Sequence, residues 1–438
     1  MQLKPKAPRP TAANARRRLI AASCALLGAA ARSQQANVAP ADSGLLEDWS
    51  VDSALAYYHE DGRILAIEPV VNLAKVFADG QSLNFNGTFD SLSGSSPNGA
   101  LTSHTAQTFA SPSGKATHAY TTAPGQLPVD PHYQDTRIAV GGNWTVPFTR
   151  VDQVSVGAKV SDEHDFFSVT VNASIAHDFN EKNTTLSFGI SNEFDSLSPI
   201  GGAPVPGSDY ALSQKNAGKT KDGVGALLGV TQVMTRNWLT EFNVSVDRFK
   251  GYMNDPYKIT SIIDSAGNTT GYEFESRPDQ RTRKSAYWEN RVGWNQQLST
   301  ALSLRYMTDD WGVRSDTALL HLRWTLSNRD RYIEPTFRWY RQTAADFYTP
   351  FILSATLPTA AGYQSSDSRL GAFHALTYGL KYAQKLPGLG SRTESEFSVR
   401  AEYYQQTFNE RIAAPAALQG LDLYPGLKAI LVQVGWRF

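Results

Sequence analysis

A series of sixteen long segments of alternating polarity constrains the fold of this chain more than any other feature of its sequence. In each segment apolar side chains recur at every second position, which predicts β-strands with one apolar and one hydrophilic face. Phe167, Val169 and Val171, for example, alternate with Ser168 and Thr170. The expected strands are 49–60, 63–77, 81–91, 134–147, 152–162, 165–178, 183–195, 221–233, 237–250, 281–298, 300–312, 315–327, 331–347, 373–386, 393–407 and 427–438.

The connections between these segments alternate between short and long. Counted along the chain, every even-numbered connection is a turn of a few residues, whereas the long connections are all odd-numbered. The long connections are 92–133, 196–220, 251–280, 348–372 and 408–426. Long loops at one end and tight turns at the other are typical of bacterial outer-membrane barrels. The sequence therefore predicts an all-β fold: a transmembrane antiparallel β-barrel of about sixteen strands with long extracellular loops and short periplasmic turns.

The last segment ends on an aromatic residue. Ile430, Val432, Val434, Trp436 and Phe438 lie on one face and Leu431, Gln433, Gly435 and Arg437 on the other. A strand of this kind suits a wall between lipid and water. It resembles the C-terminal signature of outer-membrane barrels, and this resemblance implies that the barrel-assembly machinery recognises the strand ending in Phe438.

Two prolines conflict with this pattern. Pro69 and Pro335 each follow Ile-Glu inside an expected strand. Proline lacks the amide that a strand ladder needs, and a closed barrel has no free edge. Each proline is therefore expected at a bulge, or the strand assignment is wrong at that point.

Composition narrows the function classes. Aromatic residues make up 11% of the chain, yet no run of about 18 apolar residues could form a spanning helix. The full chain has 41 basic and 41 acidic residues, but 1–31 holds six of the basic and none of the acidic ones. The remainder is mildly acidic, which argues against nucleic acid as a partner. The single cysteine, Cys24, excludes disulfides, and we expect no cofactor.

The N-terminus reads as a targeting segment. Arg16–Arg18 precede a short apolar stretch and small residues, which predicts a signal peptide over 1–31. An alternative is a lipoprotein acylated at Cys24. Residues 32–47 are small and polar and are expected to form a flexible periplasmic arm, followed by the barrel over 48–438.

One short motif occurs twice. Phe-Asp-Ser-Leu-Ser spans 89–93 and again 194–198, each time where an expected strand enters a long loop. Asp90 and Asp195 could cap the loop entries by accepting backbone hydrogen bonds. A weaker alternative is a pair of carboxylates at the outer rim that binds a cation or a substrate.

Several motifs together resemble DUF3570, a family of predicted bacterial outer-membrane barrels of undetermined function. These are Tyr-Tyr-His-Glu-Asp-Gly-Arg-Ile at 57–64, the loop entry at 90–99, Gly-Tyr-Met-Asn-Asp-Pro-Tyr-Lys at 251–258, Glu-Ser-Arg-Pro-Asp-Gln-Arg at 275–281 and Arg-Gln-Thr-Ala-Ala-Asp-Phe-Tyr at 341–348. The resemblance implies an envelope barrel located in the outer membrane and surrounded by its lipid. It assigns no functional residue.

Charged residues on the expected inner face gather in the second half of the chain. They are Glu289, Arg291, Arg305, Arg323, Arg338, Lys381, Arg400, Glu402 and Arg437. Rings of charge select permeants in channels, and a sixteen-stranded wall generally leaves an aqueous path. The first hypothesis is a channel, or the barrel of an export or import system, with a small-solute permeant. The alternative is a non-conducting barrel that docks a periplasmic or extracellular partner.

Other site classes have weaker signals. The acidic turns at 59–61 and 162–165 could bind a metal, but surface turns are commonly charged, so no metal site is assigned. No nucleophile elbow, Walker loop or HExxH occurs, so no catalytic residue is assigned and an enzyme is not expected. The loop at 92–133 could fold into the pore or remain solvated. Within the 251–280 connection, a hairpin closed at 265–268 is expected, with Arg277 paired to Asp279 at its base.

Overall fold

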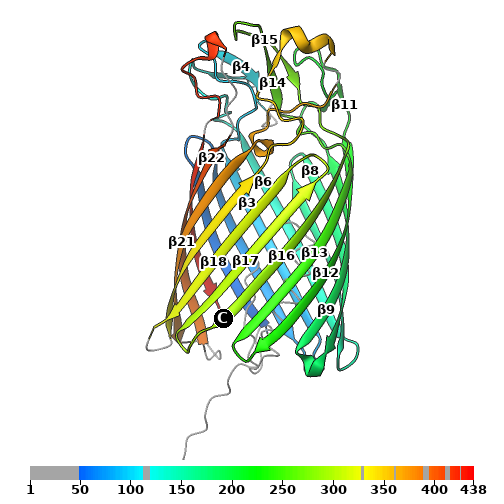
Figure 1. The fold of residues 1–438 in the computed structure, drawn as a ribbon, viewed down its shortest axis with the longest axis vertical. Helices are drawn as coiled ribbons and strands as arrows, with labels where there is room; N and C mark the ends of the chain where they lie inside the picture. Colours follow the sequence, from blue (N-terminus) through cyan, green and yellow to red (C-terminus); the bar gives the residue numbers. More distant parts are fainter. Residues whose placement is uncertain are drawn as a thin grey trace, which may run out of the picture.

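The computed structural model is a closed antiparallel barrel with a folded assembly at one end (Figure 1). It describes residues 49–111, 119–326, 330–359, 362–387, 394–409, 415–424 and 426–438, so the expected leader and arm lie outside the described residues. Each barrel strand pairs with its sequence neighbours, and β1 pairs with β23 to close the ring. The sixteen barrel strands are β1 (Trp49–Glu60), β2 (Leu65–Val76), β3 (Ser82–Ser93), β6 (Gln134–Pro147), β7 (Asp152–Glu163), β8 (Phe166–Phe179), β9 (Thr184–Leu197), β12 (Lys219–Thr235), β13 (Trp238–Gly251), β16 (Gln280–Gly293), β17 (Leu298–Asp309), β18 (Arg314–Thr325), β19 (Arg331–Gln342), β21 (Phe373–Pro387), β22 (Glu394–Phe408) and β23 (Leu427–Arg437).

The sixteen strands and their order are confirmed, and most boundaries agree within two residues. Two strand ends differ by five residues, and the first is at the β16–β17 turn, which was expected at Ser299 but lies at 294–297. Asn295 makes this turn, because its Oδ1 accepts hydrogen bonds from the amides of Gln297 and Leu298. The expected strand at 331–347 ends at Gln342, after which the chain enters the assembly at the barrel end.

The two faces of the wall differ in polarity. The side chains exposed on the outside are large and apolar, such as Val140, Phe188 and Phe242. The inner face carries charged and small polar groups, among them Glu241 and Arg400. An apolar exterior around a polar interior is the arrangement of a barrel in lipid. Among the described residues, no helix is both long and apolar enough to cross a membrane.

Neither proline lies at a bulge, so that expectation was wrong. Pro69 is paired with Leu55 of β1, and on its other side the β2–β3 ladder keeps one register from Ile67 to Val70. Pro335 is likewise paired with Leu380 of β21. The wall therefore tolerates a local gap in pairing on one side of each proline without inserting a residue.

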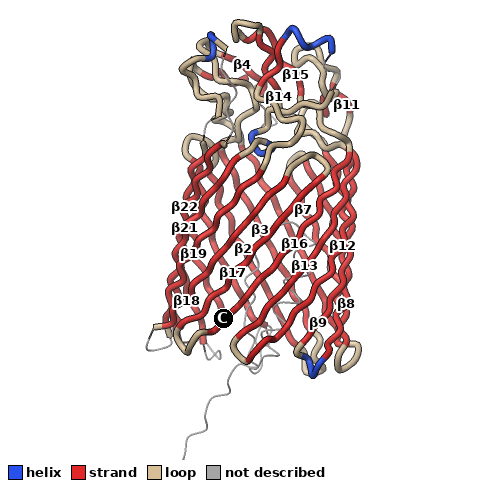
Figure 2. Tube along the Cα trace, viewed as in Figure 1, coloured by secondary structure: helices blue, strands red, loops and turns tan. Residues whose placement is uncertain are grey.

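The five long connections fold together beyond the end of the barrel (Figure 2). We call the described residues of 94–133, 198–218, 252–279, 343–372 and 409–426 the cap. Its hairpins and short helices are β4 (Gln107–Ala110), β5 (Ala119–Thr122), β10 (Ala203–Pro204), β11 (Lys215–Asn216), β14 (Ile259–Ile263), β15 (Thr269–Phe274), β20 (Phe351–Leu353), η2 (Ser354–Thr359), η3 (Ser368–Leu370) and η4 (Ala416–Leu418). The short turns and the C-terminal residue lie at the opposite end, where η1 (Asn180–Lys182) forms one turn (Figure 1).

Small hydrophobic cores hold the connections together. Phe109 packs with Ile259 and Phe274, which joins the connections at 94–133 and 252–279. A second cluster joins Leu101, Ile263 and Leu418 from three connections. The described parts of the 94–133 connection are thus neither folded into the pore nor a solvated loop, because they contribute to the core of the cap.

Candidate functional site

The lumen wall contains the charged residues that the sequence singled out. Outward apolar side chains flank the first eight along their strands, so these face the interior, and the ninth, Arg437 at the end of β23, pairs with Asp52 of β1 at 3.0 Å. Glu289 and Arg291 lie on β16, Arg305 on β17, Arg323 on β18, Arg338 on β19, Lys381 on β21, and Arg400 and Glu402 on β22. Their contribution to a pore remains a prediction.

These charges form specific pairs. Arg291 donates its Nε to Glu289, and Arg323 donates its Nε to Oε2 of Glu334 at 2.7 Å. Arg400 lies 3.4 Å from Glu402. Lys381 is buried, with its ammonium 5.6 Å from the centre of the Tyr332 ring.

Glu334 belongs to this set and was missed. It is only 5% exposed and contacts both Arg323 and His321. The sequence could have identified it, because Glu334 and Arg338 lie an even number of positions apart on one strand and therefore on the same face. It was read only as the residue before an anomalous proline.

Asp90 and Asp195 lie inside the wall rather than at loop entries, because β3 and β9 extend through the repeated motif to Ser93 and Leu197. Asp90 is paired with Arg137 of β6, and Asp195 with Lys221 of β12 at 2.7 Å. The repeat therefore places two similar cross-strand ion pairs on the inner face.

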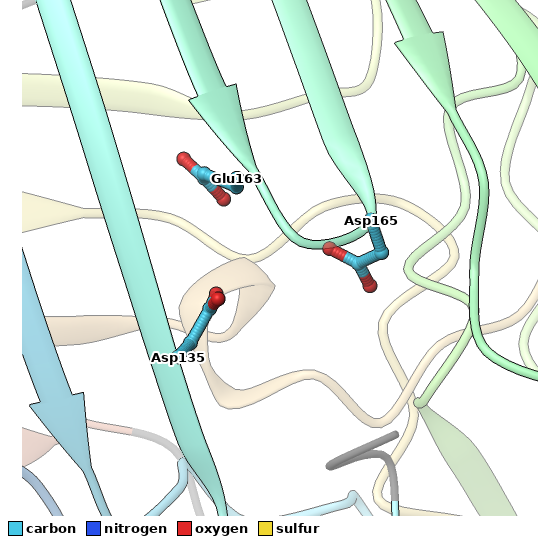
Figure 3. Close-up of side chains that lie close together, drawn as sticks. All are labelled: Asp135, Glu163 and Asp165. Carbon is cyan, nitrogen blue, oxygen red and sulfur yellow. The ribbon is translucent and has the colours of Figure 1, made fainter.

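Three carboxylates gather where β6, β7 and β8 approach the cap (Figure 3). Ligand oxygens of Asp135, Glu163 and Asp165 lie within 4.8 Å of one another. The hydroxyl of Tyr257 in the cap donates to Asp165 at 2.5 Å, and that of Tyr133 to Asp135 at 3.2 Å. Oxygen ligands of this kind suit hard cations, but the tyrosines already satisfy part of the cluster. We assign no metal site to it.

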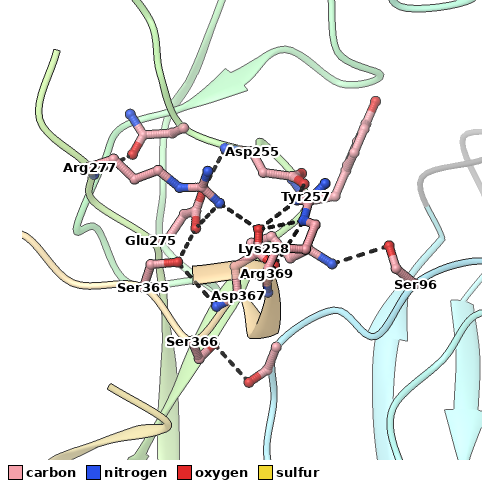
Figure 4. Close-up of polar contacts among 12 residues, drawn as sticks. Ser96, Asp255, Tyr257, Lys258, Glu275, Arg277, Ser365, Ser366, Asp367 and Arg369 are labelled. Carbon is pink, nitrogen blue, oxygen red and sulfur yellow. Dashed lines mark hydrogen bonds and ion pairs between the residues drawn. The ribbon is translucent and has the colours of Figure 1, made fainter. Parts of the chain in front are cut away.

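A charge network built around the buried Asp367 and Glu275 lies in the cap (Figure 4). It contains the acids Asp255, Glu275 and Asp367 and the bases Lys258, Arg277 and Arg369. Arg277 bonds Asp367 at 2.8 Å, and Arg369 bonds the same carboxylate at 2.6 Å. Because Asp367 belongs to the connection at 343–372 and Arg277 to that at 252–279, the network ties two connections together.

A third connection enters the network through Lys258. This lysine is 5% exposed and donates to the carbonyl of Pro97, while the hydroxyl of Ser366 donates to that of Gly99 at 2.9 Å. The backbone amide of Ile259 also bonds the Asn98 carbonyl at 2.9 Å. β3 and β13, which lead into these two connections, are six places apart in the ring of sixteen strands. The cap therefore joins connections that start from distant parts of the barrel rim.

The hairpin expected in the 252–279 connection is confirmed, since β14 and β15 pair and the turn at 264–268 closes them. Its expected ion pair was wrong. Arg277 contacts Glu275 and Asp367 instead of Asp279. Asp367 is ninety residues away in the sequence, so no local spacing could have identified it.

Burial and charge shift the pKa values of the network in different directions. Burial alone would raise the pKa of Asp367, but Arg369, Lys258 and Arg277 hold it well below its usual range. Burial raises the pKa of Glu275 to about 7, against the attraction of Arg277. Burial also lowers the pKa of Lys258. Of the two carboxyls, only Glu275 titrates near neutral pH.

The shift at Glu275 predicts that the cap loosens as pH rises. A carboxyl whose folded-state pKa lies above its unfolded value contributes stability below the unfolded pKa, and loses it as pH rises through the folded one. The window runs from about 4.5 to about 7. Protease cleavage within the cap should therefore be faster at pH 8 than at pH 5.5, assayed with a protease of equal activity at both. Glu275→Gln should remove this difference, and equal cleavage of the wild type at both pH values would contradict the assignment.

The comparisons with known proteins identify the family. The model of the family described as "Protein of unknown function (DUF3570)" matches residues 16–438. The chain belongs to the DUF3570 family. A comparison with curated proteins gives no match.

Solved structures similar to this DUF3570 chain are outer-membrane proteins of low sequence identity. The outer membrane protein OpdK from Pseudomonas aeruginosa is 10% identical, with 90% of this chain and 100% of that chain covered and a TM-score of 0.40. A bacterial polysaccharide outer membrane secretin is 9% identical, with coverages of 89% and 98% and a TM-score of 0.41. The ferric-catecholate import receptor Fiu from E. coli K12 is 8% identical, with coverages of 89% and 82% and a TM-score of 0.40. Similarity at this level carries no functional assignment.

Proposed function

We propose that this protein is a transport barrel of the outer membrane, acting as a channel or as the barrel of an export or import system. The observation that carries the proposal is the lumen wall. Arg291, Arg305 and Arg323 point inward and remain exposed to the interior. A structural barrel has no need of cations exposed in its lumen, whereas a conduit uses them to choose what passes.

The cap gives this transport barrel a closed state. Its connections start from distant parts of the barrel rim and share the charge network, so a solute in the lumen reaches the outside only when they separate. Toward the short-turn end, a cavity of about 480 Å³ lies against the wall of the lumen. We therefore expect solute to enter from the periplasmic side and leave when the cap opens.

The charge of the wall provides the test of transport. The protein for this test is residues 32–438, refolded and inserted into a planar bilayer. The double variant Arg323→Ser, Arg338→Ser removes two inward-facing positive charges, so its ion preference should shift toward cations. Arg341→Ser is a matched control, because its side chain is 60% exposed and lies on the outward face of β19. An unchanged reversal potential under a salt gradient would count against a conducting lumen.

A second candidate is a docking barrel whose cap binds an extracellular partner. Apolar side chains exposed on the cap favour it, with Leu212 at 82% and Tyr363 at 56% exposure. A folded barrel that shows no conductance in a planar bilayer, even after the cap is loosened, would favour this alternative.

A further inference from the structure

A recess in the lumen wall near the short-turn end has the features of a ligand site. The cavity of about 480 Å³ is within the size range of small-molecule sites. Its floor is formed by the short side chains of Ser299, Ala301 and Ser303 on β17. In the strand register, Arg291 stands beside Ala301 on one side and Arg323 beside Ser299 on the other. Two arginines thus flank a floor of small residues.

Both arginines are oriented by contacts with neighbouring residues of the wall. Arg291 bonds Glu289 through Nε, and the hydroxyl of Tyr287 donates to the second oxygen of that carboxylate. Arg323 bonds Glu334 through Nε at 2.7 Å, and its guanidinium lies 4.3 Å from the centre of the Tyr332 ring. These contacts fix the orientation of each guanidinium.

The terminal nitrogens of both arginines remain available. The two side chains are 49% and 45% exposed, and within the described part of the chain their terminal nitrogens make no hydrogen bond. A guanidinium presents these nitrogens as a planar fork that matches a carboxylate. Each fork is therefore pre-oriented toward the lumen.

The acids nearby do not cancel this attraction. The side chains of Glu289 and Glu334 are 12% and 7% exposed and lie on the Nε side of their arginines. Two further acids act on the arginines: Glu241, which is 2% exposed, and Glu396, which accepts a hydrogen bond from the hydroxyl of Tyr332 at 2.9 Å. An anion on the fork would lie about 3 Å from the guanidinium nitrogens and roughly twice as far from the carboxylate, so attraction exceeds repulsion. The cation of Arg236 also lines the recess.

We propose that this recess binds a small organic anion bearing one or two carboxylates, with Arg291 and Arg323 as its binding residues. The proposal rests on the proposed function, because it makes the recess the site where a transported solute is first held. His321 lines the same recess, 3.5 Å from Glu334, and completes its polar wall.

Calorimetry on the detergent-refolded barrel tests the proposal with ligands of matched length. Succinate should bind, whereas butane-1,4-diol and the cation putrescine should not. Inorganic phosphate is the further comparison, and phosphate binding as tight as succinate binding would overturn the assignment to carboxylates. Absence of succinate binding to the folded wild type would overturn the site itself.

Arginine-to-lysine variants distinguish recognition by the planar guanidinium from attraction by a positive charge alone. Arg291→Lys and Arg323→Lys keep the ion pairs with Glu289 and Glu334 but lose the planar fork, so each should weaken succinate binding at least tenfold. Arg305→Ser is the control, because it removes an exposed inner-face arginine that does not line the recess. Heat-modifiable migration on a gel confirms that each variant is folded.

The outcomes also separate this site from transport. Unchanged binding in both lysine variants, or an equal loss in Arg305→Ser, would overturn the recess as the binding site. Succinate binding to a barrel that never conducts would leave the site standing and reject transport. Conduction without succinate binding would reject the site alone.

Discussion

Replacing Asp367 by Asn is expected to destabilise the cap by about 3–5 kcal/mol, the usual cost of removing one partner from a buried ion pair. Asp367 is 2% exposed and is shared by Arg277 and Arg369. Its loss leaves the largely buried Arg277 and Lys258 with less opposing charge, whereas Arg369, whose side chain is 62% exposed, stays in contact with water. Asparagine has the same shape, so the effect reports the charge.

Limited proteolysis measures this effect. Cleavage in the cap should be faster in Asp367→Asn by two orders of magnitude or more, because cleavage follows the population of the opened state. The barrel itself should still migrate as a heat-modifiable species. Asp209→Asn makes the same chemical change at an exposed position of the cap and should be silent. Equal protease resistance in Asp367→Asn and Asp209→Asn would show that the network does not hold the cap.

Replacing Trp311 by Ala is expected to cost about 3–5 kcal/mol, the range for truncating a large buried aromatic side chain. Trp311 lies in the β17–β18 connection and is 3% exposed. Its indole NH donates to the Gln280 carbonyl at 2.8 Å, and its ring contacts Phe347 of the cap with centroids 5.1 Å apart. The guanidinium of Arg281 stacks 4.4 Å from the ring centre. This residue therefore joins the rim of the barrel to the connection at 343–372.

The expected result is a lower melting temperature and earlier cleavage between 343 and 372. Trp294→Ala is the matched control, since Trp294 is 63% exposed at the opposite end of the barrel. If Trp311→Ala melts and is cleaved like Trp294→Ala, the contact with Phe347 does not anchor the cap.

The barrel was predictable because polar and apolar side chains must alternate along each of its strands. A strand that separates lipid from water must alternate, so Val169 and Val171 reveal their face without reference to any other strand. The number of alternating segments gave the strand count, and the alternation of long and short connections placed all five long connections at one end. Errors remained where a side chain makes a local turn, as Asn295 does.

The cap was not predictable in the same way. Its contacts join residues far apart in the chain, such as Arg277 with Asp367 and Leu101 with Leu418. No period links such pairs, and the sequence favoured the nearer partner Asp279 for Arg277. The recess has an intermediate status, because alternation placed Arg291 and Arg323 on the inner face but only the strand register shows that they flank one floor.

Single-channel recording in a planar bilayer, with the wild type and Asp367→Asn side by side, tests most directly whether the lumen conducts and the cap closes it. We expect rare, brief conductance steps for the wild type and frequent steps of the same unit size for the variant, since the wall is unchanged and only the cap is loosened. Two folded proteins that both stay silent, or that open equally often, would contradict it.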